Sequence, residues 1–258
     1  MAVSDYLKTH RERHLAELFD WLRIPSISAK SEHRDDTRLA AEWLVERMLE
    51  AGLQVAEAIP TAGHPIVIGE WRGAPEGAPT LLVYGHYDVQ PPEPLDEWVS
   101  PAFQPELRDG KIYARGSVDD KGQVYLHLKA VEAHIAENGS LPVNLVFVVE
   151  GEEEVGSPNL QGFLVENRDR LRCDAVMISD TTMFAEGLPS VTVGLRGLAY
   201  MEIHVQGPAT DLHSGSYGGA VVNPANALAQ IIARLHDEQG RVAVPGFYDD
   251  VRDLGEEE

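Results

Sequence analysis

Three apolar runs along the chain predict buried strands, because polar positions do not alternate with the apolar ones. They occupy residues 80–84, 142–149 and 174–178. Each run is too short for a helix and is bounded by proline, glycine or polar residues. Helical patterns at 120–137 and 158–171 separate the runs. Strands of this kind separated by helices are typical of α/β proteins, so we predict a mostly parallel central sheet with helices on both faces.

The flanking sequence predicts further elements around this sheet. One helical pattern ends at Ile24 and Pro25, and the next ends at Gly52, where glycine suits a left-handed helix cap. Asp109 and Gly110 have the composition of a hairpin turn. The predicted helices are at residues 5–23, 35–52 and 224–236, and the predicted strands are at residues 54–59, 65–71 and 198–205.

Candidate metal ligands follow the buried runs. His86 and Asp88 come directly after the first run, a triple glutamate at 152–154 follows the second, and Asp180 follows the third. The carboxyl ends of parallel strands meet at one edge of a sheet, where open α/β folds build their sites. We therefore expect His86, Asp180 and one of the last two glutamates to lie together. Taken one at a time, the histidine also fits a hydrogen-bonded strand end, and the glutamates fit a solvated charge run.

The helical pattern at 120–137 and the residue before it contain further candidate metal ligands. Asp119 stands just before it, where a carboxylate either caps a helix or binds a cation. His127 and His134 lie within it and lack a second histidine at a metal-binding spacing. We expect these two histidines to have packing or surface roles.

Composition and charge narrow the possible partners. The chain has 258 residues, with 21 Lys and Arg against 42 Asp and Glu and a formal net charge of −21. This charge argues against nucleic acid and against anionic membranes as partners. No segment approaches the roughly 18 apolar residues of a membrane span, and the first residues lack the features of a signal peptide, so we expect no membrane partner and a cytoplasmic location.

A metal in this chain must be held by histidine and carboxylates. The single cysteine, Cys173, excludes an internal disulfide framework and a cysteine-based zinc cluster. One histidine among several carboxylates favours Zn²⁺, with Mn²⁺ or Co²⁺ as plausible alternatives. A further glutamate beside such a site can act as a general base toward water. The residues therefore predict a metal-dependent hydrolase.

Five motifs, in this order along the chain, resemble the dinuclear zinc aminoacylase, carboxypeptidase and dipeptidase superfamily. The closest resemblance is to its cytosolic nonspecific (carnosine) dipeptidase branch. The motifs are GHYDVQP at 85–91, ARGSVDDKG at 114–122, EGEEEVGS at 150–157, ISD at 178–180 and DLHSGSYGG at 211–219. The resemblance implies metal-dependent hydrolysis of dipeptides, an amide-bond hydrolase activity with a small peptide as substrate.

The resemblance also implies a set of metal ligands. Two divalent ions, most simply Zn²⁺, are expected to be bridged by Asp119, with His86 and Asp180 as ligands of opposite metals. Glu154 is implied as a further ligand of one of them. A cis peptide bond between Asp119 and Asp120 is implied as well.

Catalytic roles follow from the same resemblance. Glu153 is implied as the general base, and Asp88 as the carboxylate that orients His86. A register one residue earlier, with Glu152 and Glu153 in the two glutamate roles, stays open. His213 is implied to reach the substrate, commonly in the active site of a partner subunit, where it stabilises the oxyanion.

Two domains are implied by the resemblance, a metal-binding catalytic domain at 1–195 and the start of a smaller α+β lid domain at 196–258. A homodimer through the lid is also implied. Family members run well past this length and return to the metal domain with one more histidine ligand, so the chain is expected to be C-terminally truncated. We then expect an exposed apolar sheet edge and one metal that is held less tightly than the other.

Other functions remain open at this stage. The nearer alternatives are an N-acyl amino acid deacylase or a succinyl-diaminopimelate desuccinylase of the same superfamily. The more distant alternative is an inactive metal-binding fragment.

Overall fold

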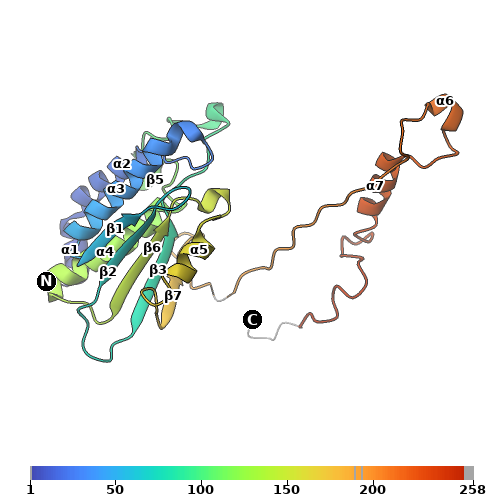
Figure 1. Cartoon of the computed structure of the whole chain (residues 1–258). Coiled ribbons are helices and arrows are strands. Elements are labelled where there is room, and N and C mark those ends of the chain that lie inside the picture. Colours follow the sequence, from blue (N-terminus) through green and yellow to red (C-terminus); the bar gives the residue numbers. More distant parts are fainter. Residues whose placement is uncertain (1, 189, 193, 253–258) are drawn as a thin grey trace. The chain divides into compact units, whose positions relative to one another are not determined.

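The chain divides into two compact units, Met1–Thr192 and Val193–Glu258, in a computed structural model that describes residues 2–188, 190–192 and 194–252 (Figure 1). The first unit contains the sheet and most of the helices. Over the described part of the chain, none of the helices combines the length and the apolar character that crossing a membrane requires.

A five-stranded sheet forms the centre of the first unit (Figure 1). In the spatial order β1-β2-β6-β3-β7, its strands are β1 (Val55–Ile59), β2 (Ile66–Trp71), β6 (Asn144–Glu150), β3 (Thr80–His86) and β7 (Ala175–Ile178). β3 pairs in parallel with β6 and β7, whereas β2 pairs antiparallel with β1 and β6. All strands except β2 therefore run in the same direction, and the predicted mostly parallel sheet is confirmed.

Helices cover both faces of the sheet, and β6 is therefore buried on both sides. Leu145, Phe147 and Val149 belong to a core shared with the helices on one face, and Val146 and Val148 belong to a core on the other. The helices of the first face are α2 (Arg11–Leu22), α3 (Arg34–Glu50) and α4 (Lys121–Asn138), and α5 (Leu160–Glu166) lies on the second. The alternation of side chains along a strand thus divides one apolar run between two cores.

The two turns predicted from glycine, at Gly52 and at Asp109 and Gly110, are confirmed, and a further glycine ends α4. Gly52 follows α3 at φ +97°, and Gly139 caps α4 at φ +69°. Asp109 and Gly110 both have positive φ, which is the pattern of a two-residue hairpin turn. This turn joins β4 (Glu106–Arg108) to β5 (Lys111–Tyr113). The shorter 3-10 helices are η1 (Ser31–His33), η2 (Leu95–Glu97) and η3 (Glu153–Val155).

The predicted helix at 5–23 is two helices, α1 (Val3–Thr9) and α2. They meet at His10, whose ring Nδ1 lies 2.9 Å from the carbonyl oxygen of Tyr6. The side chain thus shares a carbonyl that the helical ladder also uses, and the two helices join at that point. The predicted helix at 158–171 shortens to α5.

The second unit holds α6 (Ser214–Tyr217) and α7 (Pro224–Ala233). α7 confirms the predicted helix, since Asn223 caps it by accepting a hydrogen bond from the amide of Ala225 at 2.8 Å and Pro224 occupies its first turn. The predicted strand at 198–205 is wrong, because the described residues there are not paired with any strand. Alternating side chains can select a face, but a strand also needs a neighbour for its backbone groups.

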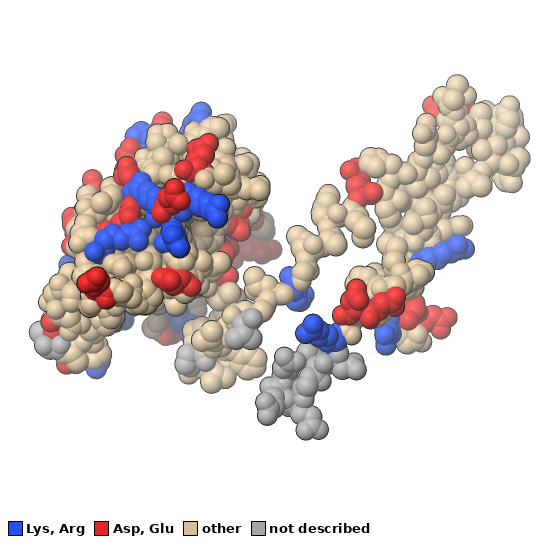
Figure 2. Space-filling model, turned by 60° about the horizontal axis from the view of Figure 1, so that its bottom comes forward, with Lys and Arg blue, Asp and Glu red and all other residues tan. Residues whose placement is uncertain are grey.

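Charge is unevenly distributed over the surface of the first unit. Figure 2 shows a face on which Lys and Arg side chains gather in one group, with Asp and Glu side chains beside it. The excess of acidic residues therefore does not give a uniformly acidic surface.

Candidate metal centre

The parallel strands deliver the candidate ligands to one edge of the sheet. β3 ends at His86, which lies in register with Glu150 at the end of β6. β7 ends at Ile178, opposite Tyr84 of β3, and Asp180 follows two residues later. His86 and Asp180 thus follow strands that end at the same edge of the sheet, as the sequence predicts.

His86, Asp119 and Asp180 form a cluster that could hold a metal ion. The Nε2 of His86 lies 3.1 Å from an oxygen of Asp119 and 3.7 Å from an oxygen of Asp180. One ligand atom from each residue lies within 4.8 Å of the others. His86 is fully buried, yet its Nε2 has no hydrogen-bond partner among the described residues. A divalent cation between imidazole and carboxylates would satisfy this atom, so the residues present fit a metal.

Negative charge is concentrated around the His86 ring. Burial alone lowers the pKa of His86, but the hydrogen bond to Asp88 and the nearby carboxylates outweigh burial and raise it to about 10. Burial raises the pKa of Asp120 to about 7, and burial also raises the pKa values of Glu153 and Glu154. Carboxylates packed this closely repel one another unless a proton or a cation lies among them.

Asp88 supports the site on two sides. Its Oδ1 lies 3.3 Å from the Nδ1 of His86, and its backbone oxygen lies 3.1 Å from the same nitrogen. Its carboxylate also accepts hydrogen bonds from the amides of Glu153, at 3.3 Å, and Glu154, at 3.1 Å. Asp88 thus fixes the histidine and the turn that carries the candidate base and ligand.

The triple glutamate separates into residues with different surroundings. Glu152 is buried, and its carboxylate accepts a 2.7 Å hydrogen bond from Asn159. Glu153 and Glu154 are half-buried. The carboxylate of Glu154 accepts a 2.7 Å hydrogen bond from Gln90 and is not part of the three-residue cluster.

The Asp119–Asp120 peptide bond is cis, as the resemblance implies. Asp120 is buried, and its carboxylate accepts a 3.2 Å hydrogen bond from the amide of His86. Lys121 is also buried, and it donates to the carbonyls of Trp21, at 3.1 Å, and Ile24, at 2.8 Å. Burial lowers the pKa of Lys121 to about 7.

His213 lies in the second unit, at the start of α6. Its Nδ1 accepts a 3.0 Å hydrogen bond from the amide of Gly215. The two units are separate bodies, so the role of His213 toward a substrate stays a prediction.

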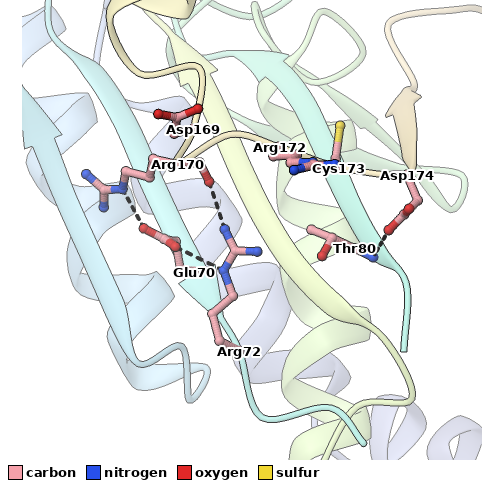
Figure 3. Close-up of a pocket in the computed structure, with 8 residues that line it drawn as sticks. All are labelled: Glu70, Arg72, Thr80, Asp169, Arg170, Arg172, Cys173 and Asp174. Atoms are coloured by element: carbon pink, nitrogen blue, oxygen red, sulfur yellow. Dashed lines mark hydrogen bonds and ion pairs between the residues drawn. The ribbon is translucent and has the colours of Figure 1, made fainter. Parts of the chain in front are cut away.

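A hollow lined mostly by charged side chains lies at the opposite end of the strands (Figure 3). Its volume is about 420 Å³, and it adjoins Thr80 at the start of β3 and Asp174 just before β7. Glu70 receives hydrogen bonds from Arg170, at 2.6 Å, and Arg72, at 3.1 Å, and Asp174 receives one from the Thr80 amide at 2.8 Å. These contacts lie at the end of the sheet where the parallel strands begin, away from the metal-binding edge.

Two supporting side chains were missed from the sequence. The hydroxyl of Ser28 donates a 2.6 Å hydrogen bond to Asp88 across 60 residues of chain, and Lys121 bonds to the end of α2 across about 100. No local pattern links positions so far apart. Of the two, only Lys121 could have been found from the sequence. A lysine beside two aspartates at the start of a helix is expected to have a bonding partner.

The sequence profile of peptidase family M20/M25/M40 matches residues 82–254. The Beta-Ala-His dipeptidase of Homo sapiens is 33% identical over 270 residues, which covers 99% of this chain and 53% of that protein. The Cys-Gly metallodipeptidase DUG1 of Candida albicans is 35% identical over 272 residues, which covers 99% of this chain and 56% of that protein.

A solved structure resembles the chain as well. The M20 family metallo-carboxypeptidase Sso-CP2 from Sulfolobus solfataricus superposes with a TM-score of 0.76 at 38% identity, covering 95% of this chain and 54% of that one. The chain thus spans about half the length of the relatives that it matches.

Proposed function

The chain belongs to peptidase family M20/M25/M40, and on that premise we propose that it carries the metal-binding part of a dipeptidase. The observation that carries the proposal is the buried Nε2 of His86, which has no hydrogen-bond partner in the described structure and faces Asp119 and Asp180. The relatives named Beta-Ala-His dipeptidase and Cys-Gly metallodipeptidase point to short peptides as the substrate class.

Two divalent metal ions complete the proposed site, with Zn²⁺ preferred and Mn²⁺ or Co²⁺ as alternatives. His86, Asp119 and Asp180, which lie together, would hold them with Glu154 as a further ligand. Imidazole and carboxylate donors fit these metals. Bound there, such ions act as Lewis acids toward water and the scissile carbonyl.

Glu153 is the general base of this proposal. It takes a proton from the attacking water as the new C–O bond forms, and it returns the proton to the amine nitrogen as the C–N bond breaks. Two observations favour Glu153 over Glu152. The Glu152 carboxylate is buried and engaged by Asn159, whereas Glu153 is half-buried with its amide fixed by Asp88.

The remaining assignments complete the proposal. Asp88 orients His86 through the Nδ1 nitrogen. His213, from the lid at 196–258, stabilises the developing oxyanion. A homodimer formed through the lid and a cytosolic location stay predictions.

A carboxypeptidase is the second candidate, because the metallo-carboxypeptidase Sso-CP2 shares 38% identity with the chain and has the TM-score of 0.76. The two activities differ in the length of peptide accepted. A dipeptidase needs both termini of a two-residue substrate, whereas a carboxypeptidase needs only the C-terminal end.

Metal analysis and a substrate panel test the proposal together. The purified chain is loaded with Zn²⁺ or Mn²⁺, its metal content is measured, and hydrolysis of β-Ala-His, Cys-Gly, tetrapeptides and N-acyl amino acids is assayed. We expect bound metal and cleavage of the two dipeptides. Cleavage of tetrapeptides would favour the carboxypeptidase, cleavage of N-acyl amino acids a deacylase, and an absence of metal would overturn the proposed site.

A further inference from the structure

Asp180 lies beyond the part of the sheet that holds its strand. The pairing of β3 with β7 ends at Tyr84 and Ile178, so the backbone of Ser179 and Asp180 is outside the ladder. β7 is also the outermost strand of the sheet formed by the described residues. The chain turns immediately, with the Thr181 amide donating a 2.7 Å hydrogen bond to the carbonyl of Ser179. A candidate ligand at such a position needs support from outside the sheet.

That support comes from the middle of α4. The Nε2 of His127 and the hydroxyl of Ser179 share a hydrogen bond across 52 residues of sequence. His127 also lines an apolar cavity of about 220 Å³ with Val83 and Met177, so this part of α4 lies over β3 and β7. Met177 and Ser179 are two positions apart and share one side of the extended chain, the side that faces the helix.

We propose that His127 is a positioning residue, which holds Ser179 and thereby places the carboxylate of Asp180 within reach of His86 and Asp119. The inference rests on the proposed function for the identity of the metal site. Its geometric basis is independent of that function, because the hydrogen bond joins a helix to the residue just before the candidate ligand.

α4 acquires a double role from this contact. Its first residue, Lys121, directly follows Asp119 and Asp120, so the helix begins at one candidate ligand. His127, less than two turns further on, fixes the loop that carries another. One rigid helix therefore sets the separation between Asp119 and Asp180, whereas the ladder alone sets only the position of His86.

Four variants separate this role from a general loss of packing. His127→Leu keeps the apolar volume and removes the hydrogen bond, and Ser179→Ala removes it from the other side. His127→Gln keeps an amide that can donate or accept at about the position of Nε2. His134→Leu is the matched control, because His134 lines the same cavity but its ring contacts Asn138, at the end of α4.

The first measurement is the dissociation constant for Zn²⁺, obtained by competition with a chromogenic chelator. We expect His127→Leu and Ser179→Ala each to weaken Zn²⁺ binding about tenfold, as for other groups that orient ligands. The double variant should be no weaker than either single one, because both remove the same bond. His127→Gln should remain within about threefold of the unaltered chain, and His134→Leu should match it. Equal affinity in His127→Leu, or additive losses in the double variant, would overturn the proposal.

The second measurement is amide hydrogen exchange of residues 180–182 in the metal-free chain. We expect faster exchange in His127→Leu than in the unaltered chain or in His134→Leu, because the loop loses its contact with α4. If the unaltered chain binds no Zn²⁺, the proposed function fails. The exchange measurement alone then tests whether His127 holds the loop. Unchanged exchange in His127→Leu would then refute the positioning role.

Discussion

Two acidic residues of the site, Asp119 and Glu153, differ in what they contact, and the proposed function gives them different roles. Asp119 has an oxygen 3.1 Å from the buried Nε2 of His86. Glu153 lies outside that three-residue cluster, on a turn fixed through its backbone amide by Asp88. If the proposed roles hold, removing the Asp119 carboxylate takes away a metal ligand, whereas removing the Glu153 carboxylate takes away a proton acceptor.

Asp119→Ala is therefore expected to lose most of the bound metal, and Glu153→Gln is expected to keep it. Turnover should fall by about 100-fold or more in Glu153→Gln, within the range typical for a general base. Metal content by atomic emission and turnover of a dipeptide check both statements. Equal metal loss in the two variants would contradict the division of roles.

The candidate ligands were predictable residue by residue because each follows a recognisable apolar run or a motif. His86 and Asp180 stand directly after buried strands, and parallel strands share a carboxyl edge. The supporting contacts were not predictable in the same way. Ser28 is 60 residues from Asp88, and His127 is 52 residues from Ser179, so only the folded chain brings them together. The prediction that His127 has a plain packing or surface role missed this contact.

At the scale of elements, a partly buried ion-pair network joins α2 to α4. Glu17 of α2 lies 2.7 Å from Arg13 and 2.7 Å from Lys129 of α4. Glu132 of α4 receives hydrogen bonds from Arg13 and Lys129. Burial opposes ionisation of both glutamates, but these bonds outweigh it and lower both pKa values from 4.5 to about 2.

This network makes the free energy of unfolding depend on pH. Because the folded pKa values are lower than the unfolded ones, the stabilisation is complete above pH 4.5 and is lost as the pH falls toward 2. Glu132→Gln should lower the free energy of unfolding by on the order of 2 kcal/mol at pH 6, and the difference should shrink as the pH falls from 4.5 toward 2. Urea denaturation at pH 6, 4 and 3 measures it.

The control for this network is Glu12→Gln. Glu12 is exposed and pairs only with Arg11 of its own helix among the contacts of the described residues. Exposed pairs contribute little, so we expect a change below about 0.5 kcal/mol at every pH. A Glu132→Gln difference that stays constant from pH 6 to pH 3 would show that packing, not charge, holds α2 to α4.

β7 is an exposed apolar strand at the edge of the sheet. Val176 and Ile178 are each 56% exposed, and no described strand pairs with the outer side of β7. Unpaired apolar edges recruit other strands. We expect concentration-dependent association of the chain in sedimentation velocity, and we expect Val176→Lys to reduce it. Val165→Lys is the control, since Val165 is also exposed, at 71%, but lies on α5. An equal effect of both substitutions would rule out edge pairing.

Apolar patterning predicted the strands of the sheet but failed where a strand depends on a distant partner. β3, β6 and β7 lack polar alternation and lie where the runs predicted them. Residues 198–205 show alternation without forming a strand, since a pattern within one segment does not supply the neighbour that completes its hydrogen bonds. The join at His10 was not predicted either, because no glycine or proline marks it in the sequence.

At the scale of the whole molecule, the candidate metal residues all belong to one of the two units. His86, Asp88, Asp119 and Asp180 lie within Met1–Thr192, as does the helix that supports them. We therefore expect metal affinity to be a property of the first unit. In the proposed function, the second unit contributes to substrate binding through His213.

A shortened chain of residues 1–192 should bind Zn²⁺ within about threefold of the affinity of the whole chain. His213→Ala in the whole chain should also leave Zn²⁺ affinity unchanged while lowering dipeptide turnover. Chelator competition and a dipeptide assay measure the two effects. Loss of Zn²⁺ binding in the shortened chain would show that the second unit provides a ligand.

The pairing of β3 with β7 joins two segments that leave the ribosome at different times. Thr80, at the start of β3, contacts Asp174, which lies 94 residues later, just before β7. At the roughly 5–20 residues per second of protein synthesis, about 5 to 20 s separate the emergence of these segments from the ribosome. During that interval the apolar strand that ends in His86 has left the ribosome while β7 has yet to be made. The metal-binding edge is thus among the last parts of the first unit to be assembled, and a chaperone that shields residues 80–86 would act in this window.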